Sequence, residues 1–289
     1  AEMQAFLDAL DGKFIAPGPS GAPSRGRLDV LPTGRNFYSV DTRAVPTPSA
    51  WELGRKSAES LVLRHFQDHG HYLRAVALSV WGTANMRTGG DDIAQALALI
   101  GARPTWDPGS LRVSGYEIIP LAKLGRPRVD VTLRISGFFR DAFPAQIALF
   151  DRAVRAIGAL DEPEDDNPIA ARMRSEALGL MASGKSEVAA ALEAGARIFG
   201  SKPGTYGAGL GQLIDNGKWT DKADLADQTI AWGQYAYGAT AAGLPLQDRF
   251  RARLGQLDAV IHNQDNREHD LLDSDNYYQF EGGLSLAAE

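Results

Sequence analysis

The stretch GRPRVDVTLRISGFFRDAFPAQIALFDRAVRAIGAL, residues 125–160, decides the fold that we expect for this chain. A run of apolar, largely β-branched residues in its first part predicts a buried strand. Its members are Val129, Val131, Leu133 and Ile135. Ser136-Gly137 ends the strand, and Pro144 opens an amphipathic helix. The stretch therefore predicts a strand, a short loop and a helix, as in α/β proteins.

The loop between this strand and helix contains Phe138, Phe139, Arg140 and Asp141. Loops outside the carboxyl ends of parallel strands hold the ligand sites of α/β proteins, so these side chains are candidates for ligand binding. In the alternative interpretation, Arg140 and Asp141 form a structural ion pair that fastens the loop to the helix. The sequence leaves both interpretations open.

The composition narrows the possible functions. The 289 residues allow one large or two small domains, and the net charge of -6, with no basic stripe, argues against a nucleic-acid surface. No apolar stretch is as long as a membrane span and the first residues lack signal-peptide order, so we expect a soluble, cytoplasmic protein. The absence of cysteine excludes disulfides, thiolate zinc sites and iron–sulfur clusters, so any metal must meet histidine, carboxylate, amide or a bound substrate.

The residues before the deciding stretch indicate an irregular leading segment and then an α/β domain. Residues 1–36 predict a short helix, ended by Gly12, followed by a segment rich in proline, glycine and serine. Residues 37–160 predict strand-helix units that form a parallel or mixed sheet. The expected elements are helices at 49–69 and from Asp91, and strands at 75–80 and at 112–120 after a hairpin turn at 107–109.

The strand at 75–80 leads into the glycine-containing loop WGTANMRTGG, residues 81–90, and then into the helix that begins with Asp91-Asp92. Free backbone N–H groups at the start of such a helix favour an anion, so the loop is a candidate binding site. Asp91 and Asp92 can equally cap the helix and satisfy its dipole without any ligand. The pattern therefore indicates an anion site without being specific for one.

An acidic, proline-containing break at residues 161–168 separates the α/β domain from the rest of the chain. We expect a mainly helical subdomain at 161–289. Its expected helices are Ile169–Ser183, Ser186–Ile198, Asp221–Tyr237 and Leu246–Ile261.

Residues 179–186, GLMASGKS, match the phosphate-loop pattern GxxxxGK[ST]. A phosphate loop must leave a buried strand, whereas the residues before Gly179 keep helical spacing. Gly184 and Ser186 are typical of a helix end and of the next helix start. We therefore predict a junction between two helices and no nucleotide site.

Residues 262–283, HNQDNREHDLLDSDNYYQFEGG, hold the greatest concentration of metal-binding side chains in the chain. If they were helical, Asp265, Glu268, His269 and Asp273 would share one face and could hold a divalent ion. A solvated polar cluster is the alternative. The other histidines, His65, His69 and His71, end a helix and are interpreted as surface residues.

Five stretches match one known family in their amino-acid sequence and in their order along the chain. They are LPTGRNFYSVDTRAVPTPSAWELG (31–54), SVWGTANMRTGGDDIAQALALIGARP (79–104), YEIIPLAKLGRPRVDVTLRISGFFRDAFPAQIALFDRAV (116–154), FGSKPGTYGAGLGQLID (199–215) and residues 262–283. With them the chain resembles the large subunit of aerobic cobaltochelatase, a relative of the large magnesium chelatase subunit. The tail at 262–283 resembles the cobalt branch.

Members of that family are several times longer, and this chain resembles only a stretch toward their C-terminal end. Their upstream glycine-rich segment, with a histidine and a glutamate implicated in metal insertion, has no counterpart here. The resemblance therefore implies a fragment, or one piece of a divided subunit, that needs the remainder of the large subunit and is inactive alone.

The resemblance also implies the reaction of the whole enzyme, which is the insertion of Co2+ into hydrogenobyrinic acid a,c-diamide in cobalamin biosynthesis. Two partner subunits of the AAA+ type would drive it, with ATP and Mg2+ on a partner and not on this chain. Two alternatives stay open. The chain could belong to a magnesium chelatase large subunit acting on protoporphyrin IX, or be a non-catalytic docking module for an AAA+ partner.

Metal insertion needs a base near the ring and oxygen or imidazole ligands that release the ion again. Our candidates for metal delivery or proton acceptance are Glu268, His269 and Asp270, and the candidate metal ligands are Glu268, His269, Asp273, Asp275 and Glu281. A flat ring edged by carboxylates and amides also needs aromatic faces and anion-binding groups. The two strand-end loops offer Trp81, Asn85, Arg87, Thr88, Phe138 and Arg140 for substrate binding.

Overall fold

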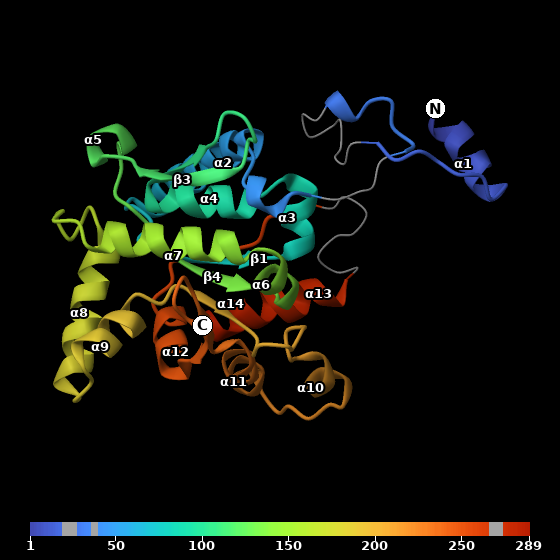
Figure 1. Cartoon of the computed structure of the whole chain (residues 1–289). Helices are drawn as coiled ribbons and strands as arrows, with labels where there is room; N and C mark the ends of the chain where they lie inside the picture. The colour runs from blue at the N-terminus through green and yellow to red at the C-terminus, as the bar shows by residue number, and fades with distance from the viewer. Residues whose placement is uncertain (19–27, 36–39, 266–273) are drawn as a thin grey trace.

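The computed structural model of this chain describes residues 1–18, 28–35, 40–265 and 274–289 (Figure 1). Its centre is a mixed sheet of six described strands in the order β7-β6-β5-β4-β1-β8. Strands β5, β4, β1 and β8 are parallel to one another, and β6 and β7 are added in antiparallel orientation. The strands are β1 Ala75–Val80, β4 Asp130–Ile135, β5 Ile198–Gly200, β6 Tyr235–Tyr237, β7 Ala242–Pro245 and β8 Ala259–Ile261.

The centre of the sheet is the parallel pair β1 and β4, which runs in register from Ala75 beside Asp130 to Val80 beside Ile135. Every residue of both strands is buried, because helices cover both faces of the sheet. The β-branched run near residue 130 therefore forms a buried strand, as the sequence predicts, and the α/β fold class is confirmed.

One face of the sheet is covered by α4 (Asp91–Ile100) and α7 (Pro144–Gly158), with α2 (Pro48–His69) packed against α4. The expected helix after Pro144 is α7. The hairpin expected around residues 107–109 also forms, from β2 (Ala102–Trp106) and β3 (Val113–Ile118). This hairpin is a separate two-stranded sheet, so its strands do not extend the central sheet as we had expected for residues 112–120.

The opposite face of the sheet is covered by α11 (Lys222–Gly233), α12 (Gln247–Leu254) and α14 (Gly283–Ala288), around a core that includes Phe199 and Phe250. The other helical segments are α1 Glu2–Leu10, η2 Leu28–Val30, η3 Thr42–Ala44, α3 Gly82–Thr88, α5 Leu121–Leu124, α6 Gly137–Ala142, α8 Pro168–Ala182, α9 Glu187–Ala194, α10 Gly211–Asp215, α13 Asp275–Tyr277 and the π-helix η4 Tyr278–Gly282. No helix of the described residues is long and apolar enough to span a membrane.

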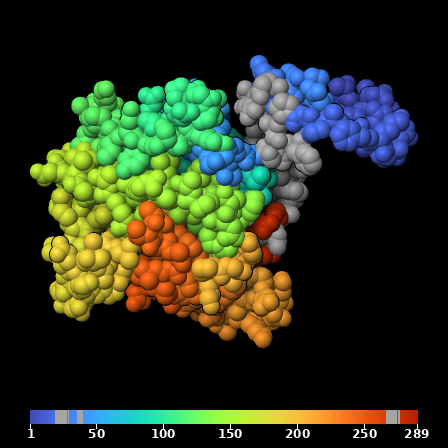
Figure 2. All heavy atoms as spheres, viewed as in Figure 1, coloured from blue at the N-terminus to red at the C-terminus, as the bar shows by residue number. Residues whose placement is uncertain are grey.

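The leading segment contains the short helix that the sequence predicts, as α1. No residue of α1 is buried, and the helix projects from the body of the chain (Figure 2).

The region beyond residue 161 is less helical than we expected, because it supplies four strands of the central sheet. Three predicted helices end early, and a short strand occupies part of the remaining range. A glycine stands at or just after each early end, Gly195 for α9, Gly233 for α11 and Gly255 for α12, and glycine is a poor helix former. A strand of three residues is too short to show a periodicity in the sequence. The proposed boundary at residue 161 stays a prediction.

The GLMASGKS stretch joins two helices, as predicted. Residues 179–182 complete α8, and α9 begins at Glu187. Gly184 lies between them with φ of 94°, and the Ser186 hydroxyl accepts the backbone N–H of Ala189 at 3.3 Å. Since α8 and not a strand precedes these residues, they do not form a phosphate loop.

A buried carboxylate joins the second half of the chain to the start of β4. Asp130 accepts hydrogen bonds from Arg197 Nε at 2.6 Å, Arg253 Nη1 at 3.3 Å and Arg172 Nη1 at 3.5 Å. Burial by itself would raise the pKa of Asp130, but the three guanidinium groups outweigh it and lower that pKa to about 2. The group is therefore ionised and holds α8, α12 and the segment before β5 against the sheet.

We expect Asp130→Asn to lower the free energy of unfolding at pH 7 by about 3–5 kcal/mol, because three guanidinium groups lose a buried partner. Urea denaturation measures this change. Asp130 stabilises the fold above its unfolded pKa of 3.8, and this contribution is lost as the pH falls toward about 2. The difference in the free energy of unfolding between wild type and Asp130→Asn should therefore shrink over that pH range. Asp165→Asn is the control, because its side chain is 95% exposed; an equal effect there would contradict the prediction.

The helix junction generates a second prediction, in which one chemical change acts in opposite directions. Gly179 lies in α8 with open space around it, so Gly179→Ala should stabilise the fold by about 0.5–1 kcal/mol. Gly184→Ala should destabilise it by roughly 1–2 kcal/mol, because a Cβ atom is unfavourable at a φ of 94°. Urea midpoints of the two variants test this, and shifts in the same direction would argue against the described junction.

Candidate functional site

The loops after β1 and β4 lie side by side at the carboxyl edge of the sheet. The Ser136 hydroxyl accepts the backbone N–H groups of Gly82 at 3.2 Å and of Phe139 at 3.1 Å, and so joins the two loops. Gly82 permits this approach, because a Cβ atom there would lie 2.5 Å from the ring of Phe138. The two loops that the sequence singled out therefore form one surface.

The segment after β8 joins this surface. Arg87 donates two hydrogen bonds to the carboxylate of Asp265, at 2.6 and 3.1 Å. Asn263 donates to Asp92 at 2.9 Å and to Gln95 at 2.7 Å. The structure therefore brings the start of the stretch 262–283, which we predicted to bind metal, against the loop that follows β1.

An aromatic cluster covers the end of β1. The ring of Trp81 lies 4.8 Å from His262, 5.4 Å from Tyr277, on which it stacks, and 5.5 Å from Phe280. Trp81 Nε1 donates to the hydroxyl of Ser79 at 3.1 Å, which holds the indole in place. Residues from both ends of the 262–283 stretch thus pack on one tryptophan.

Beside this cluster, an imidazole and a carboxyl group lie close together. His262 Nδ1 and Glu281 Oε2 are 3.4 Å apart, and neither atom has a hydrogen-bond partner among the described residues. Burial lowers the pKa of His262 and raises the pKa of Glu281, so both shifts favour the neutral forms. Such a pair can accept or donate a proton within an aromatic environment.

Most of the predicted metal ligands lie outside the described residues. Glu268, His269, Asp270 and Asp273 belong to this undescribed part, and the side chain of Asp275 is not described although its backbone begins α13. Of the predicted metal ligands, the side chain of Glu281 can be placed, beside His262. Asp265, which we expected on the same helical face as Glu268 and His269, lies outside any helix and pairs with Arg87. Within the described part of the chain, no group of three or more histidine, aspartate or glutamate side chains could hold a metal ion.

Three of the predicted substrate-binding residues present open surface. Phe138 is 39% exposed, the side chain of Arg87 is 40% exposed beside Asp265, and Trp81 is half-buried. Two others have internal partners: Asn85 is buried and donates to the carbonyl of Trp81 at 2.8 Å, and the half-buried Thr88 accepts the backbone N–H groups of Gly90 and Asp91.

Arg140 has internal partners for its whole guanidinium group. It donates to the Asp141 carboxylate at 2.7 and 2.8 Å, and Nη1 also donates to the carbonyls of Lys202 at 2.9 Å and Thr205 at 3.0 Å. The hydrogen bond with Asp141 raises the pKa of Arg140, and Tyr206 donates to the same carboxylate. This geometry favours the fastening alternative, in which Arg140 ties the loop after β4 to the loop after β5.

Sequence reasoning missed Asp92 as a residue of the site, because it gave Asp92 only a capping role. The N-cap of α4 is Gly90, and the carboxylate of Asp92 points inward to Asn85 and Asn263. Burial raises the pKa of Asp92 to about 7, although hydrogen bonds from both amides oppose the shift. His262, Tyr277 and Phe280 were part of the quoted stretch, but nothing in the sequence indicated that they pack on Trp81.

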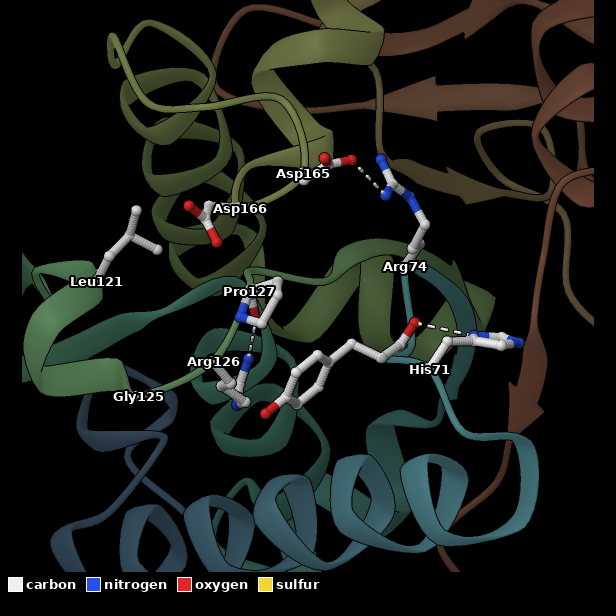
Figure 3. A pocket seen from close by; sticks show the side chains of 9 residues that line it. His71, Arg74, Leu121, Gly125, Arg126, Pro127, Asp165 and Asp166 are labelled. Atoms are coloured by element: carbon white, nitrogen blue, oxygen red, sulfur yellow. Dashed lines mark hydrogen bonds and ion pairs between the residues drawn. The ribbon is translucent and has the colours of Figure 1, made fainter.

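A cavity of about 620 Å³ lies at the other, amino-terminal edge of the parallel strands (Figure 3). Arg74 pairs with Asp165 at 3.2 Å at its rim, and Arg126 donates to the carbonyl of Leu99 at 3.1 Å. Burial lowers the pKa of Arg126 to about 10. His71 also lines this cavity. Its lining residues precede β1 and β4 in the chain or follow α7, so the cavity is separate from the loops that follow these strands.

The three histidines interpreted as surface residues cluster at the end of α2. His69 and His71 are exposed, as predicted, whereas His65 is half-buried. Their ring centroids lie between 4.4 and 6.0 Å apart. Burial is the largest cause that lowers the pKa of His65, and His69 adds to it.

Comparison with known proteins identifies relatives along the whole chain. The family model CobN/Magnesium Chelatase matches residues 1–289. The chain is 67% identical to the aerobic cobaltochelatase subunit CobN of Sinorhizobium sp. and 61% identical to that of Pseudomonas aeruginosa, over its full length in both cases. It is 35% identical to a magnesium-chelatase subunit of Chlorobaculum parvum.

The chain spans 22–23% of the length of these curated relatives. A solved structure of the catalytic subunit of cobaltochelatase from Mycobacterium tuberculosis matches 99% of this chain and 24% of its own, with a TM-score of 0.87 and 50% identity. Sequence and fold agree over the whole chain, and the chain belongs to the CobN/magnesium chelatase family.

Proposed function

We propose that this chain is part of the large subunit of an ATP-dependent cobaltochelatase, a ligase that inserts Co2+ into hydrogenobyrinic acid a,c-diamide in cobalamin biosynthesis. One observation carries the choice of the cobalt branch. The chain is 61–67% identical to aerobic cobaltochelatase subunits and 33–36% identical to magnesium chelatase subunits. We infer that the chain supplies part of the site and is inactive without the remainder of the large subunit.

In this proposal the strand-end loops receive the macrocycle. Trp81 and Phe138 offer aromatic faces, and the partly exposed Arg87 offers a cation for the carboxylate edge of the ring. Asn85, Thr88 and Arg140 then contribute by shaping these loops, because each already has internal partners. This division of roles follows from exposure.

Metal delivery and proton acceptance are assigned to Glu268, His269 and Asp270, with Asp273, Asp275 and Glu281 as further oxygen ligands. The described flanks support this assignment, since Asp265 is held by Arg87 and Tyr277 stacks on Trp81. Insertion displaces protons from ring nitrogens and requires ligands that release the ion, which suits carboxylate and imidazole better than thiolate.

We assign ATP hydrolysis to an AAA+ partner subunit. Residues 179–186 match the phosphate-loop pattern, but they connect α8 to α9. They therefore lack the preceding strand that a phosphate loop requires.

The test of the proposal uses the complete large subunit that contains this chain, with its partner subunits. We expect an absorbance change for Co2+ with hydrogenobyrinic acid a,c-diamide and none for Mg2+ with protoporphyrin IX; the reverse result would place the protein in the magnesium branch. His269→Ala and Glu268→Gln should abolish insertion while the macrocycle still binds, because they remove ligands for the ion. Undiminished insertion would remove both residues from the proposal.

A titration of this chain alone with hydrogenobyrinic acid a,c-diamide addresses the docking-module alternative. We expect a weak absorbance shift without turnover, and we expect Trp81→Ala to reduce it because an aromatic face is lost. Trp219→Ala is the matched control, since Trp219 is 42% exposed and lies outside the loops that follow β1 and β4. The absence of any shift with the unmodified chain would favour a docking module.

A further inference from the structure

A single buried carboxylate connects two segments of the proposed site that are far apart in the chain. Asp92 lies in the first turn of α4 and is 4% exposed. Its Oδ2 accepts a hydrogen bond from Asn85 Nδ2 at 2.9 Å, and its Oδ1 accepts one from Asn263 Nδ2, also at 2.9 Å. Each oxygen of one carboxylate is therefore used by a different segment.

The donor from the second segment has one defined orientation. Asn263 Nδ2 also donates to Gln95 Oε1 at 2.7 Å, so both hydrogens of its amide have acceptors. Gln95 in turn donates to the Ser57 hydroxyl at 3.0 Å, which links this network to α2. An amide held at both hydrogens cannot turn without losing a buried hydrogen bond.

The position of Asn263 in the chain gives this contact its importance. Asn263 directly follows His262, which packs on Trp81, and precedes Gln264, which donates to the Tyr277 hydroxyl at 2.7 Å. Asp265, two residues further, pairs with Arg87. Fixing Asn263 therefore fixes the backbone from which each of these contacts is made.

We propose that Asp92 is a positioning residue of the cobalt-insertion site: by holding Asn85 and Asn263 at once, it fixes residues 262–265 against the loop after β1. The inference rests on the proposed function for its catalytic consequence. Its structural part stands on the hydrogen bonds alone. Asp92 has no contact with substrate in this scheme, and it acts through the residues that it holds.

The geometry suggests an exchange of partners as the test. Asn263→Asp places two carboxyl groups together, and Asp92→Leu removes both acceptor oxygens at similar volume, so each of these single variants loses the contact. The double variant, Asp92→Asn with Asn263→Asp, restores a donor opposite an acceptor with the direction reversed. Gln95 can follow by turning its own amide, because the Ser57 hydroxyl can donate as well as accept.

Hydrogen exchange of residues 262–265 in the unmodified and variant chains is the first measurement. We expect each single variant to exchange about 10-fold faster there, as for a lost hydrogen bond, and the double variant to recover most of the protection. Asp165→Asn is the control, since it removes a carboxylate that is 95% exposed at the other edge of the sheet and should leave this exchange unchanged. Unchanged exchange in Asp92→Leu, or a double variant worse than both single ones, would overturn the proposal.

Chelation by the complete enzyme is the second measurement. We expect the single variants to lower kcat about tenfold or more with a small change in KM for the corrin, and the double variant to recover kcat, because the misplaced segment supplies the chemistry and not the ring-binding surface. Altered exchange with unaltered kcat would refute the catalytic role of the positioning. An enzyme without cobalt-insertion activity in unmodified form would instead refute the proposed function and leave the exchange result standing.

Discussion

The parallel pairing of β1 with β4 is the constraint on which the rest of the structure depends. Parallel strands end at the same edge of a sheet, so the chain that leaves Val80 and the chain that leaves Ile135 must emerge side by side. Ser136 and Gly82 show how close the two loops come, because the hydroxyl of one accepts the backbone N–H of the other. The candidate site is therefore a consequence of strand direction before it is a consequence of any particular side chain.

Buried arginine pairs hold the second half of the chain to this sheet. Asp130 gathers three guanidinium groups at the amino end of β4, and Arg128 forms a bidentate pair with Glu162 at 2.7 and 2.9 Å. Glu162 belongs to the acidic break that looked like a boundary in the sequence. Removing one partner of such a pair leaves a buried charge without compensation, which is strongly destabilising. These contacts therefore hold the acidic segment against the sheet.

The site combines groups of different character at neighbouring positions. On one side, Trp81 and its aromatic neighbours form an apolar cluster around the His262–Glu281 pair. On the other, Arg87 holds Asp265 through an ion pair and Asp92 holds Asn263 through a hydrogen bond. An arrangement that orders the flanks of an acidic, imidazole-containing segment suits a reaction in which a cation must be held briefly and released.

The sequence by itself determined the α/β class, the strand near residue 130 and the helix junction at GLMASGKS, because these depend on local periodicity and on glycine and capping residues. Only the tertiary structure decided that residues beyond 161 complete the sheet and that Arg140 fastens two loops. It also decided that Asp92 meets Asn263. Three-residue strands carry no readable period, and hydrogen bonds between residues 171 positions apart leave no local pattern, so neither could be predicted from the chain alone.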